Sequence, residues 1–186
     1  MKAKKLRLPL TAKDTAGLKA GDSVMLSGKM LTARDGSHKR MTESLRREQK
    51  LAFTLKGQAV YYMGPTPARQ GQVIGSAGPT TSSRMDVYTP LLLQAGVKCM
   101  IGKGKRSEEV RMAMQKHKAV YLAVVGGAGA LIAKTIKKAR PVAYLDLGAE
   151  AIYELEVENL PAVVINDIFG NDLYSEGRDK YRKTQA

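Results

Sequence analysis

Residues 97–125, VKCMIGKGKRSEEVRMAMQKHKAVYLAVV, decide the fold class. Apolar runs at Val97–Ile101 and Val120–Val125 predict two strands, and Ser107–His117 between them predicts a helix. Nearly continuous Val, Ile, Leu and Ala in strands that alternate with helices is typical of a sheet covered by helices. The stretch therefore predicts an α/β layered fold.

The alternation extends on both sides of this stretch. Further strands are predicted at Ala59–Met63, Gln72–Ile74, Val142–Leu147 and Val163–Ile165, and further helices at Ser37–Lys50, Ser82–Gln94, Ala128–Ala139 and Ala149–Glu158. A β-hairpin is predicted from two apolar runs around a glycine turn, Ser23–Leu26 and Met30–Ala33 around Ser27-Gly28-Lys29. The N-terminal third is therefore expected to be richer in strands, and a short basic tail is expected to follow the last strand.

Length and composition indicate one globular domain. The chain has 186 residues, of which 44% are hydrophobic and 26% charged, which is average for a soluble folded protein. We expect a single domain over residues 1–186 with a core at about 10–175. The longest apolar stretch, Ala119–Ala133, holds three glycines and falls short of the roughly 18 residues of a membrane span. No secretory signal is visible, so a cytoplasmic protein without membrane association is expected.

The formal net charge of +14 raises the alternative of a nucleic-acid-binding protein, because Lys and Arg supply most of non-specific phosphate binding. The basic residues are, however, spread along the chain, with two Phe, no Trp and no nucleic-acid-binding motif. Nucleic acid is thus an unfavoured partner. A positive field can equally attract a small dianion.

The segment Gly78-Pro79-Thr80-Thr81-Ser82-Ser83-Arg84-Met85-Asp86 carries the sharpest chemical signal. Four hydroxyl residues and Arg84 stand at a predicted helix start, where free N–H groups and the helix dipole favour anions. One such hydroxyl is often only an N-cap. Four with an arginine exceed that need and predict an anion-binding loop.

A second candidate loop is Ile101-Gly102-Lys103-Gly104-Lys105-Arg106, which follows the next predicted strand. Ligands of α/β sheets bind at the carboxyl ends of strands, and flanking glycines let the backbone approach a ligand. Lys103 is therefore expected to point into a site. Lys105 and Arg106 lack this setting and are expected to be solvated.

Other chemistries find little support in the sequence. Gly126-Gly127-Ala128-Gly129-Ala130 approaches a dinucleotide-binding motif, but Ile132 stands where the third small residue belongs. With Cys99 as the one cysteine and only two histidines, no metal site and no self-contained iron-sulfur site are expected. We expect His38, four residues after Arg34, to support the loop of that arginine.

The sequence resembles the β subunit of class I fumarases, which also occurs as the C-terminal domain of single-chain class I fumarases, and the L-tartrate dehydratase β subunit is similar. The resemblance runs from about Leu18 to Tyr174. It is carried by GPTTSSRMD (78–86), TARDGSH (32–38), KGQAVYYMGPTP (56–67), IGKGKRSEEV (101–110), YLAVVGGAGALIA (121–133) and AYLDLGAEAIYELEVENLPAVVINDIFGND (143–172).

The resemblance implies a swivelling β/β/α domain with a mixed sheet and flanking helices. It implies an active site shared with an α subunit that holds a [4Fe-4S] cluster through three cysteines, so this chain would bind no cofactor itself. By this resemblance the residues that bind the substrate are Arg34, Thr80, Thr81, Arg84 and Lys103. Of these, Thr80, Thr81 and Lys103 would also have catalytic roles.

The implied function is the reversible dehydration of (S)-malate to fumarate by an αβ hydro-lyase, with little or no activity of this chain alone. An L-tartrate dehydratase, a methylfumarate-type hydratase or another 2-hydroxy-dicarboxylate hydro-lyase stays open. The more distant alternatives are a nucleic-acid binder and a nucleotide-binding module. The sequence leaves open which residue is the general base and whether the isolated chain self-associates, although exposed basic and apolar surface is compatible with a homodimer.

Overall fold

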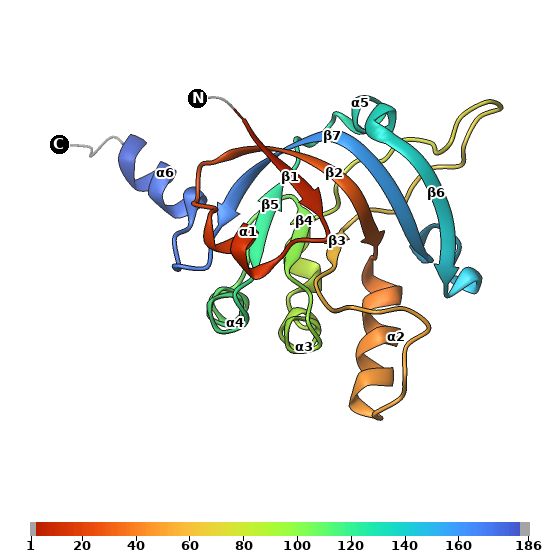
Figure 1. Cartoon of the computed structure of the whole chain (residues 1–186), viewed down its shortest axis with the longest axis horizontal. Helices are drawn as coiled ribbons and strands as arrows, with labels where there is room; N and C mark the ends of the chain where they lie inside the picture. The colour runs from red at the N-terminus through yellow and green to blue at the C-terminus, as the bar shows by residue number, and fades with distance from the viewer. Residues whose placement is uncertain (1–2, 183–186) are drawn as a thin grey trace.

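A computed structural model describes residues 3–182, in which a seven-stranded mixed sheet forms the centre (Figure 1). The sheet order is β1-β2-β3-β4-β5-β7-β6, and β7 pairs in addition with β2. This second pairing closes β2, β3, β4, β5 and β7 into a barrel-like sheet. The strands are β1 (Lys4–Leu8), β2 (Ser23–Thr32), β3 (Ala59–Tyr61), β4 (Cys99–Gly102), β5 (Val120–Ala123), β6 (Ile136–Ala143) and β7 (Ile152–Asn166).

Strands β2, β3, β4 and β5 run parallel, so their carboxyl ends meet at one edge of the sheet. The long strand β7 is antiparallel to both outer members of this set. It pairs with β2 along most of its length, from Leu31↔Glu154 to Ser23↔Val163, and with β5 near its own end. The predicted α/β class with a mixed sheet and flanking helices is thus confirmed.

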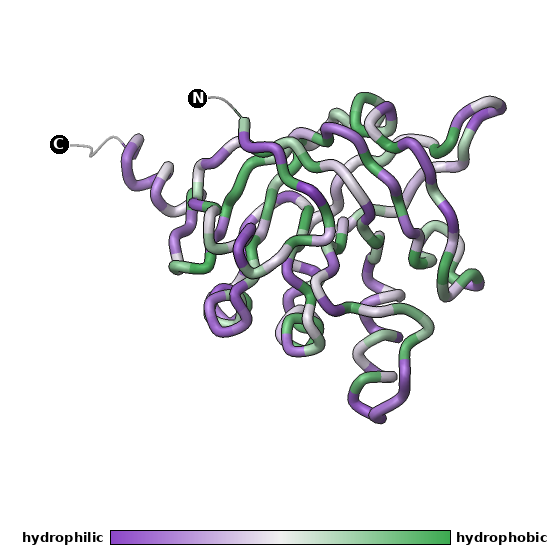
Figure 2. Tube along the Cα trace, in the orientation of Figure 1, coloured by the Kyte–Doolittle hydropathy of each residue, from purple (hydrophilic) through white to green (hydrophobic). Residues whose placement is uncertain are grey.

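Two apolar cores lie on opposite faces of the sheet, because successive side chains of a strand point to opposite sides. In β3, Ala59 and Tyr61 belong to the core inside the barrel, whereas Val60 belongs to the core under the helices. In Figure 2 the central strands β4 and β5 are mostly green, the colour of hydrophobic residues, whereas α4 is mostly purple. Helices α2, α3 and α4 cover the second core (Figure 1). The helices are α1 (Ala12–Ala16), α2 (Asp35–Arg46), α3 (Thr89–Gln94), α4 (Glu108–His117), α5 (Gly129–Thr135) and α6 (Leu173–Tyr181), with 3₁₀ turns η1 (Ser82–Met85) and η2 (Leu145–Glu150).

The C-terminal third differs most from the sequence prediction. The predicted helix at Ala149–Glu158 is wrong, since strand β7 begins at Ile152 and absorbs the short strand predicted at Val163–Ile165. The predicted helix at Ala128–Ala139 ends at Thr135 and is followed by β6. The strand predicted at Val142–Leu147 is mostly wrong, because β6 ends at Ala143 and η2 begins at Leu145. The longest strand therefore lies here rather than in the N-terminal third, and part of the expected basic tail forms α6.

Cross-strand charge pairs explain this difference. The glutamates of β7 alternate with buried residues such as Leu155. Glu154 pairs with Arg140, and Glu156 pairs with Lys138, across the β6–β7 ladder. Opposite charges on directly facing strands stabilise a β-ribbon, so glutamates that favour a helix in isolation form here the charged face of two strands.

The predicted hairpin around Gly28 is also wrong, because β2 continues through it as one strand. The ladder with β7 shifts register between Leu26 and Gly28, which marks a β-bulge. Gly28 has φ of 119°, and a side chain there would overlap the carbonyl oxygen of Leu8. The glycine thus serves a bulge and a close strand contact, not a turn.

Two further segments depart from the prediction. Residues 72–74 form no strand and lie in a loop that is joined at its base by hydrogen bonds between Thr66 and Ser76. The helix predicted at Ser82–Gln94 is split into η1 and α3. No helix within residues 3–182 is long and apolar enough to cross a membrane.

Candidate functional site

The two loops with the strongest chemical signals meet at the carboxyl edge of the parallel strands. Thr80 N donates to the carbonyl of Tyr62 (2.7 Å), just beyond β3, and Ser82 N donates to the carbonyl of Lys103 (2.9 Å), just beyond β4. Thr81 and Lys103 form a parallel bridge. The structure therefore inserts residues 80–82 as a short strand-like segment between the ends of β3 and β4.

Arg84 turns back toward Thr80 and also contacts the start of α2. Its Nη2 donates to Thr80 Oγ1 at 2.5 Å and lies 3.3 Å from Asp35 Oδ2. The side chains of Arg84 and Asp35 are 45% and 39% exposed, so solvent or a ligand can reach them. A guanidinium at this distance polarises the hydroxyl and stabilises negative charge on its oxygen.

The helix-start prediction for this loop needs a correction. Only a 3₁₀ turn follows Thr81, and no side chain caps its first residue. Ser82 is buried and its Oγ lies 2.9 Å from the hydroxyl of Tyr121, so it serves the interior. The anion-binding capacity of the loop therefore depends on Arg84, Thr80 and Thr81 rather than on a helix dipole.

Arg34 follows β2 and joins the same edge from the other side. Its Nη2 lies 3.4 Å from Glu150 Oε1, and its Nε is buried without a hydrogen-bond partner among residues 3–182. The other carboxylate oxygen of Glu150 accepts from Gly36 N at 2.7 Å. A Cβ on Gly64 would lie only 2.8 Å from Arg34 Cδ, so this glycine lets the arginine pass.

Glu150 is a site residue that the sequence analysis missed, because it fell in a segment predicted to be helical. No local motif marks it. Its position beside Arg34 depends on η2, which follows β6 and returns the chain to the start of α2. Asp35 was equally unmarked, although it is adjacent to Arg34 in the sequence.

Lys103 is exposed just beyond β4, and its side chain runs past the glycine loop after β5. A Cβ on Gly126 would lie 3.6 Å from Lys103 Cδ and 4.0 Å from Nζ. This glycine loop thus borders the site through its backbone. Lys105 is exposed, as predicted, but Arg106 is buried, and its predicted solvation is wrong.

His38 supports the Arg34 loop from α2, as predicted. The ring is buried, with Nδ1 2.8 Å from the carbonyl oxygen of Arg34, and it packs edge-on against Tyr62 at 5.1 Å between ring centroids. Burial lowers the pKa of His38 to about 4. The imidazole is therefore neutral at pH 7 and acts as a hydrogen-bonding support.

This lowered pKa predicts a pH-dependent stability. The unfolded His38 titrates near 6.5, so the unfolded state binds more protons as the pH falls from about 6.5 to about 4. We expect this residue to lower the free energy of unfolding by up to about 1.4 kcal/mol per pH unit in that window. Urea unfolding of the wild type and of His38→Asn across the window measures it. Equal slopes in both proteins would contradict the prediction.

Within residues 3–182, no group of three or more His, Cys, Asp or Glu side chains is placed to hold a metal ion. Cys99 lies inside the barrel, where burial raises the pKa of its thiol. A [4Fe-4S] cluster is held by several thiolates, whereas this chain has one cysteine, and its side chain is enclosed. The residues of this chain therefore do not fit an iron-sulfur cluster.

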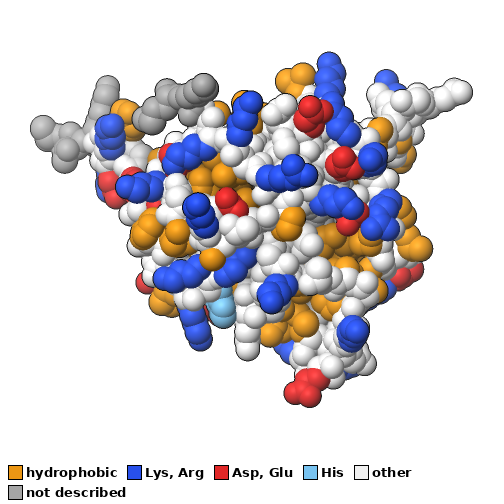
Figure 3. All heavy atoms as spheres, in the orientation of Figure 1, with side chains coloured by type: hydrophobic (Ala, Val, Ile, Leu, Met, Phe, Trp, Pro, Cys, Tyr) orange, Lys and Arg blue, Asp and Glu red, His pale blue; other side chains and the backbone are white. Residues whose placement is uncertain are grey.

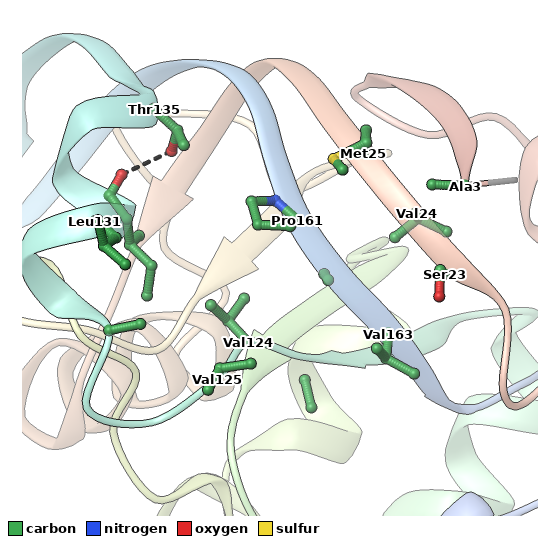
Figure 4. A pocket seen from close by; sticks show the side chains of 14 residues that line it. Ala3, Ser23, Val24, Met25, Val124, Val125, Leu131, Thr135, Pro161 and Val163 are labelled. Atoms are coloured by element: carbon green, nitrogen blue, oxygen red, sulfur yellow. Dashed lines mark hydrogen bonds between the residues drawn. The ribbon is translucent and has the colours of Figure 1, made fainter.

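A cavity of about 530 Å³ lies elsewhere, between α5, β7 and the first half of β2 (Figure 4). Its walls are almost entirely apolar and include Val124, Leu131 and Pro161. None of the five candidate residues lines it. Because it offers no cation and few hydrogen-bond donors, this cavity does not suit a small dianion.

The geometry defines an α/β domain whose parallel-strand edge gathers three cations and two threonines. A family model described as "Fumarase C-terminus" matches residues 1–177. The chain belongs to this family.

Curated relatives agree with this assignment. Fumarate hydratase 2 of Leishmania major is 39% identical over 158 residues, which covers 84% of this chain and 28% of the relative. The aerobic class I fumarate hydratase of Escherichia coli K12 is 39% identical over 153 residues, 81% of this chain and 28% of the relative. The putative L(+)-tartrate dehydratase subunit beta of Methanocaldococcus jannaschii is 40% identical over 177 residues, 92% of this chain and 91% of the relative. The chain thus spans about a quarter of the fumarate hydratases and nearly all of the tartrate dehydratase subunit.

Proposed function

We propose that this chain is the carboxylate-binding and catalytic β subunit of a fumarate hydratase that interconverts (S)-malate and fumarate. The observation that carries the proposal is the junction of Thr80, Arg84 and Lys103 at one sheet edge, joined from the β2 side by Arg34. These groups suit a diacid, because guanidinium and ammonium groups bind carboxylates and hydroxyls add short hydrogen bonds.

In the dehydration direction, a proton leaves the carbon beside one carboxylate and hydroxide leaves the neighbouring carbon. Negative charge builds on that carboxylate when the proton leaves and is removed when hydroxide departs, and fixed cations stabilise it in between. We assign Arg34, Arg84 and Lys103 to this clamping. Thr80 is favoured over Thr81 for proton transfer, because its Oγ1 accepts from Arg84 and that contact stabilises an oxygen that has lost its proton.

On this proposal, the active site is incomplete until a second polypeptide joins this chain. The fumarate hydratase relatives are more than three times as long as the matched region, since that region covers 28% of each. We propose that an iron-sulfur α chain supplies the remainder, including the cluster that assists departure of hydroxide. A cytoplasmic location is part of the same proposal.

A second candidate function is an L-tartrate dehydratase β subunit. The Methanocaldococcus jannaschii relative, a putative L(+)-tartrate dehydratase subunit beta, is 40% identical to this chain, which is as similar as the fumarate hydratases are. Tartrate carries one more hydroxyl than malate, and Thr81, which is exposed beside Lys103, is a ready partner for it.

Anaerobic reconstitution tests the proposal. The chain should be assayed alone and with the product of a neighbouring reading frame that carries three cluster cysteines, using fumarate, (S)-malate, methylfumarate and L-tartrate. We expect that the chain by itself turns over none of these diacids and that the pair hydrates fumarate. If the pair turned over L-tartrate and none of the other diacids, the second candidate function would be established. No turnover of any diacid by a cluster-loaded pair would contradict both.

The nucleic-acid alternative makes a separate prediction. In Figure 3 the Lys and Arg side chains are scattered over the visible face with acidic groups among them, rather than gathered into one stripe. Salt-sensitive retention of DNA or RNA that persists in Arg84→Ala would support this alternative over the hydro-lyase.

A further inference from the structure

Arg106 lies beneath the candidate site, in the loop between β4 and α4, and its side chain is 0% exposed. All three guanidinium nitrogens find acceptors. Nε donates to Asp86 Oδ1 (2.7 Å), Nη2 to Thr89 Oγ1 (2.7 Å) and Nη1 to the Tyr62 hydroxyl (3.2 Å). The guanidinium carbon also lies 5.2 Å from the ring centroid of Tyr62 and 5.1 Å from that of Tyr121. A buried cation with this many partners fixes them in one arrangement.

One set of contacts ties the segment after Arg84 to the loop after Lys103. Asp86, two residues beyond Arg84, accepts from Arg106 through Oδ1 and from Ser107 N through Oδ2 at 2.7 Å. The carboxylate therefore bridges the side chain and the backbone of the 103–107 loop. Loss of the guanidinium would leave this nearly buried carboxylate without its charge partner.

A second set of contacts runs through the two tyrosines. The carbonyl of Tyr62 accepts from Thr80 N. The hydroxyl of Tyr121 donates to the carbonyl of Gly104 (2.9 Å) and lies 2.9 Å from Ser82 Oγ. The guanidinium is packed against both rings and so sets the spacing between the two loops.

We infer that Arg106 is a positioning residue, which holds Thr80, Arg84 and Lys103 in the relative placement that the reaction needs without touching the substrate. The inference rests on the proposed function for its kinetic consequence. Lysine cannot replace this arginine, because a single ammonium nitrogen does not present a planar fork to three acceptors or stack between two rings.

The kinetic test uses the reconstituted pair with Arg106→Lys. We expect kcat/KM to fall by between about 10-fold and about 10²-fold, the upper figure being the loss that a misplacement of the order of an ångström causes. Both constants should change, KM rising and kcat falling. A merely structural role would reduce only the active fraction and leave KM unchanged. The matched control is Arg40→Lys, which alters a half-exposed arginine that also pairs with a carboxylate and packs on a tyrosine ring. This variant should keep wild-type constants.

Hydrogen exchange of the isolated chain tests the same inference without turnover. In Arg106→Lys the amides of Thr80, Ser82 and Ser107 should exchange faster, while those of β5 stay protected. Unchanged exchange at these three amides, or wild-type kcat/KM, would overturn the inference. If the lysine variant does not fold, Tyr62→Phe, which removes only the hydroxyl that accepts from Arg106 Nη1, must lower kcat/KM, and wild-type kinetics would overturn the inference. If the wild-type pair turns over no diacid, the proposed function fails, and the exchange measurement still decides the positioning role.

Discussion

Replacing Arg84 by methionine should lower kcat of the reconstituted enzyme by about 10²–10³-fold, the loss typical of removing one preorganised donor to developing negative charge. The arginine donates to Thr80 Oγ1 and pairs with Asp35. Methionine keeps the approximate length of the side chain but can do neither. Steady-state rates of fumarate hydration, with the cluster content of the pair held equal, measure the effect.

Folding should be unaffected by this change, because a half-exposed surface substitution shifts stability by only about 0.5 kcal/mol. Arg140→Met is the matched control, since it removes an exposed arginine that pairs with a single carboxylate on the β6–β7 ribbon. It should retain wild-type rates. Arg84→Met with unchanged kcat and KM would show that the site has been assigned to the wrong residues.

The sequence predicts the positions of the two loops better than the elements around them. Lys103 directly follows β4, and the carboxyl ends of parallel strands lie together at one edge of a sheet whatever the details of the flanking helices. The strand predicted before Thr80, at Gln72–Ile74, does not form, and Thr80 reaches the same edge through the hydrogen bond from its amide to the carbonyl of Tyr62, just beyond β3.

The partners of the cations were not predictable in the same way. Glu150 reaches Arg34 only because the chain returns through β6 and η2, and Arg106 is buried only because Asp86, Tyr62 and Tyr121 surround it. Such long-range contacts leave no local spacing to detect. The β6–β7 ribbon was missed for a related reason, since its glutamates favour a strand only when basic residues face them.

Gly102→Ala should damage both stability and turnover. Gly102 ends β4, and a methyl group there would overlap Ser82 Oγ and lie 3.1 Å from the ring of Tyr62. Ser82 cannot yield easily, because its hydroxyl is bonded to Tyr121 and its amide to the carbonyl of Lys103. Overpacking of this kind costs about 1–3 kcal/mol.

The catalytic consequence follows from the same contact. Ser82 lies between Thr81 and Arg84, so displacing it moves the whole 80–84 segment away from Lys103. We expect kcat/KM to fall by about 10²-fold in molecules that remain folded, as an ångström-scale misplacement implies. Urea unfolding and rates per folded molecule measure the two effects. The matched control is Gly177→Ala in α6, where a methyl group meets nothing within 4 Å; it should leave kcat/KM unchanged and raise stability by up to about 1 kcal/mol through helix propensity. If Gly102→Ala keeps full activity, the close seating of residues 80–84 on β4 is not what aligns the cations with Thr80.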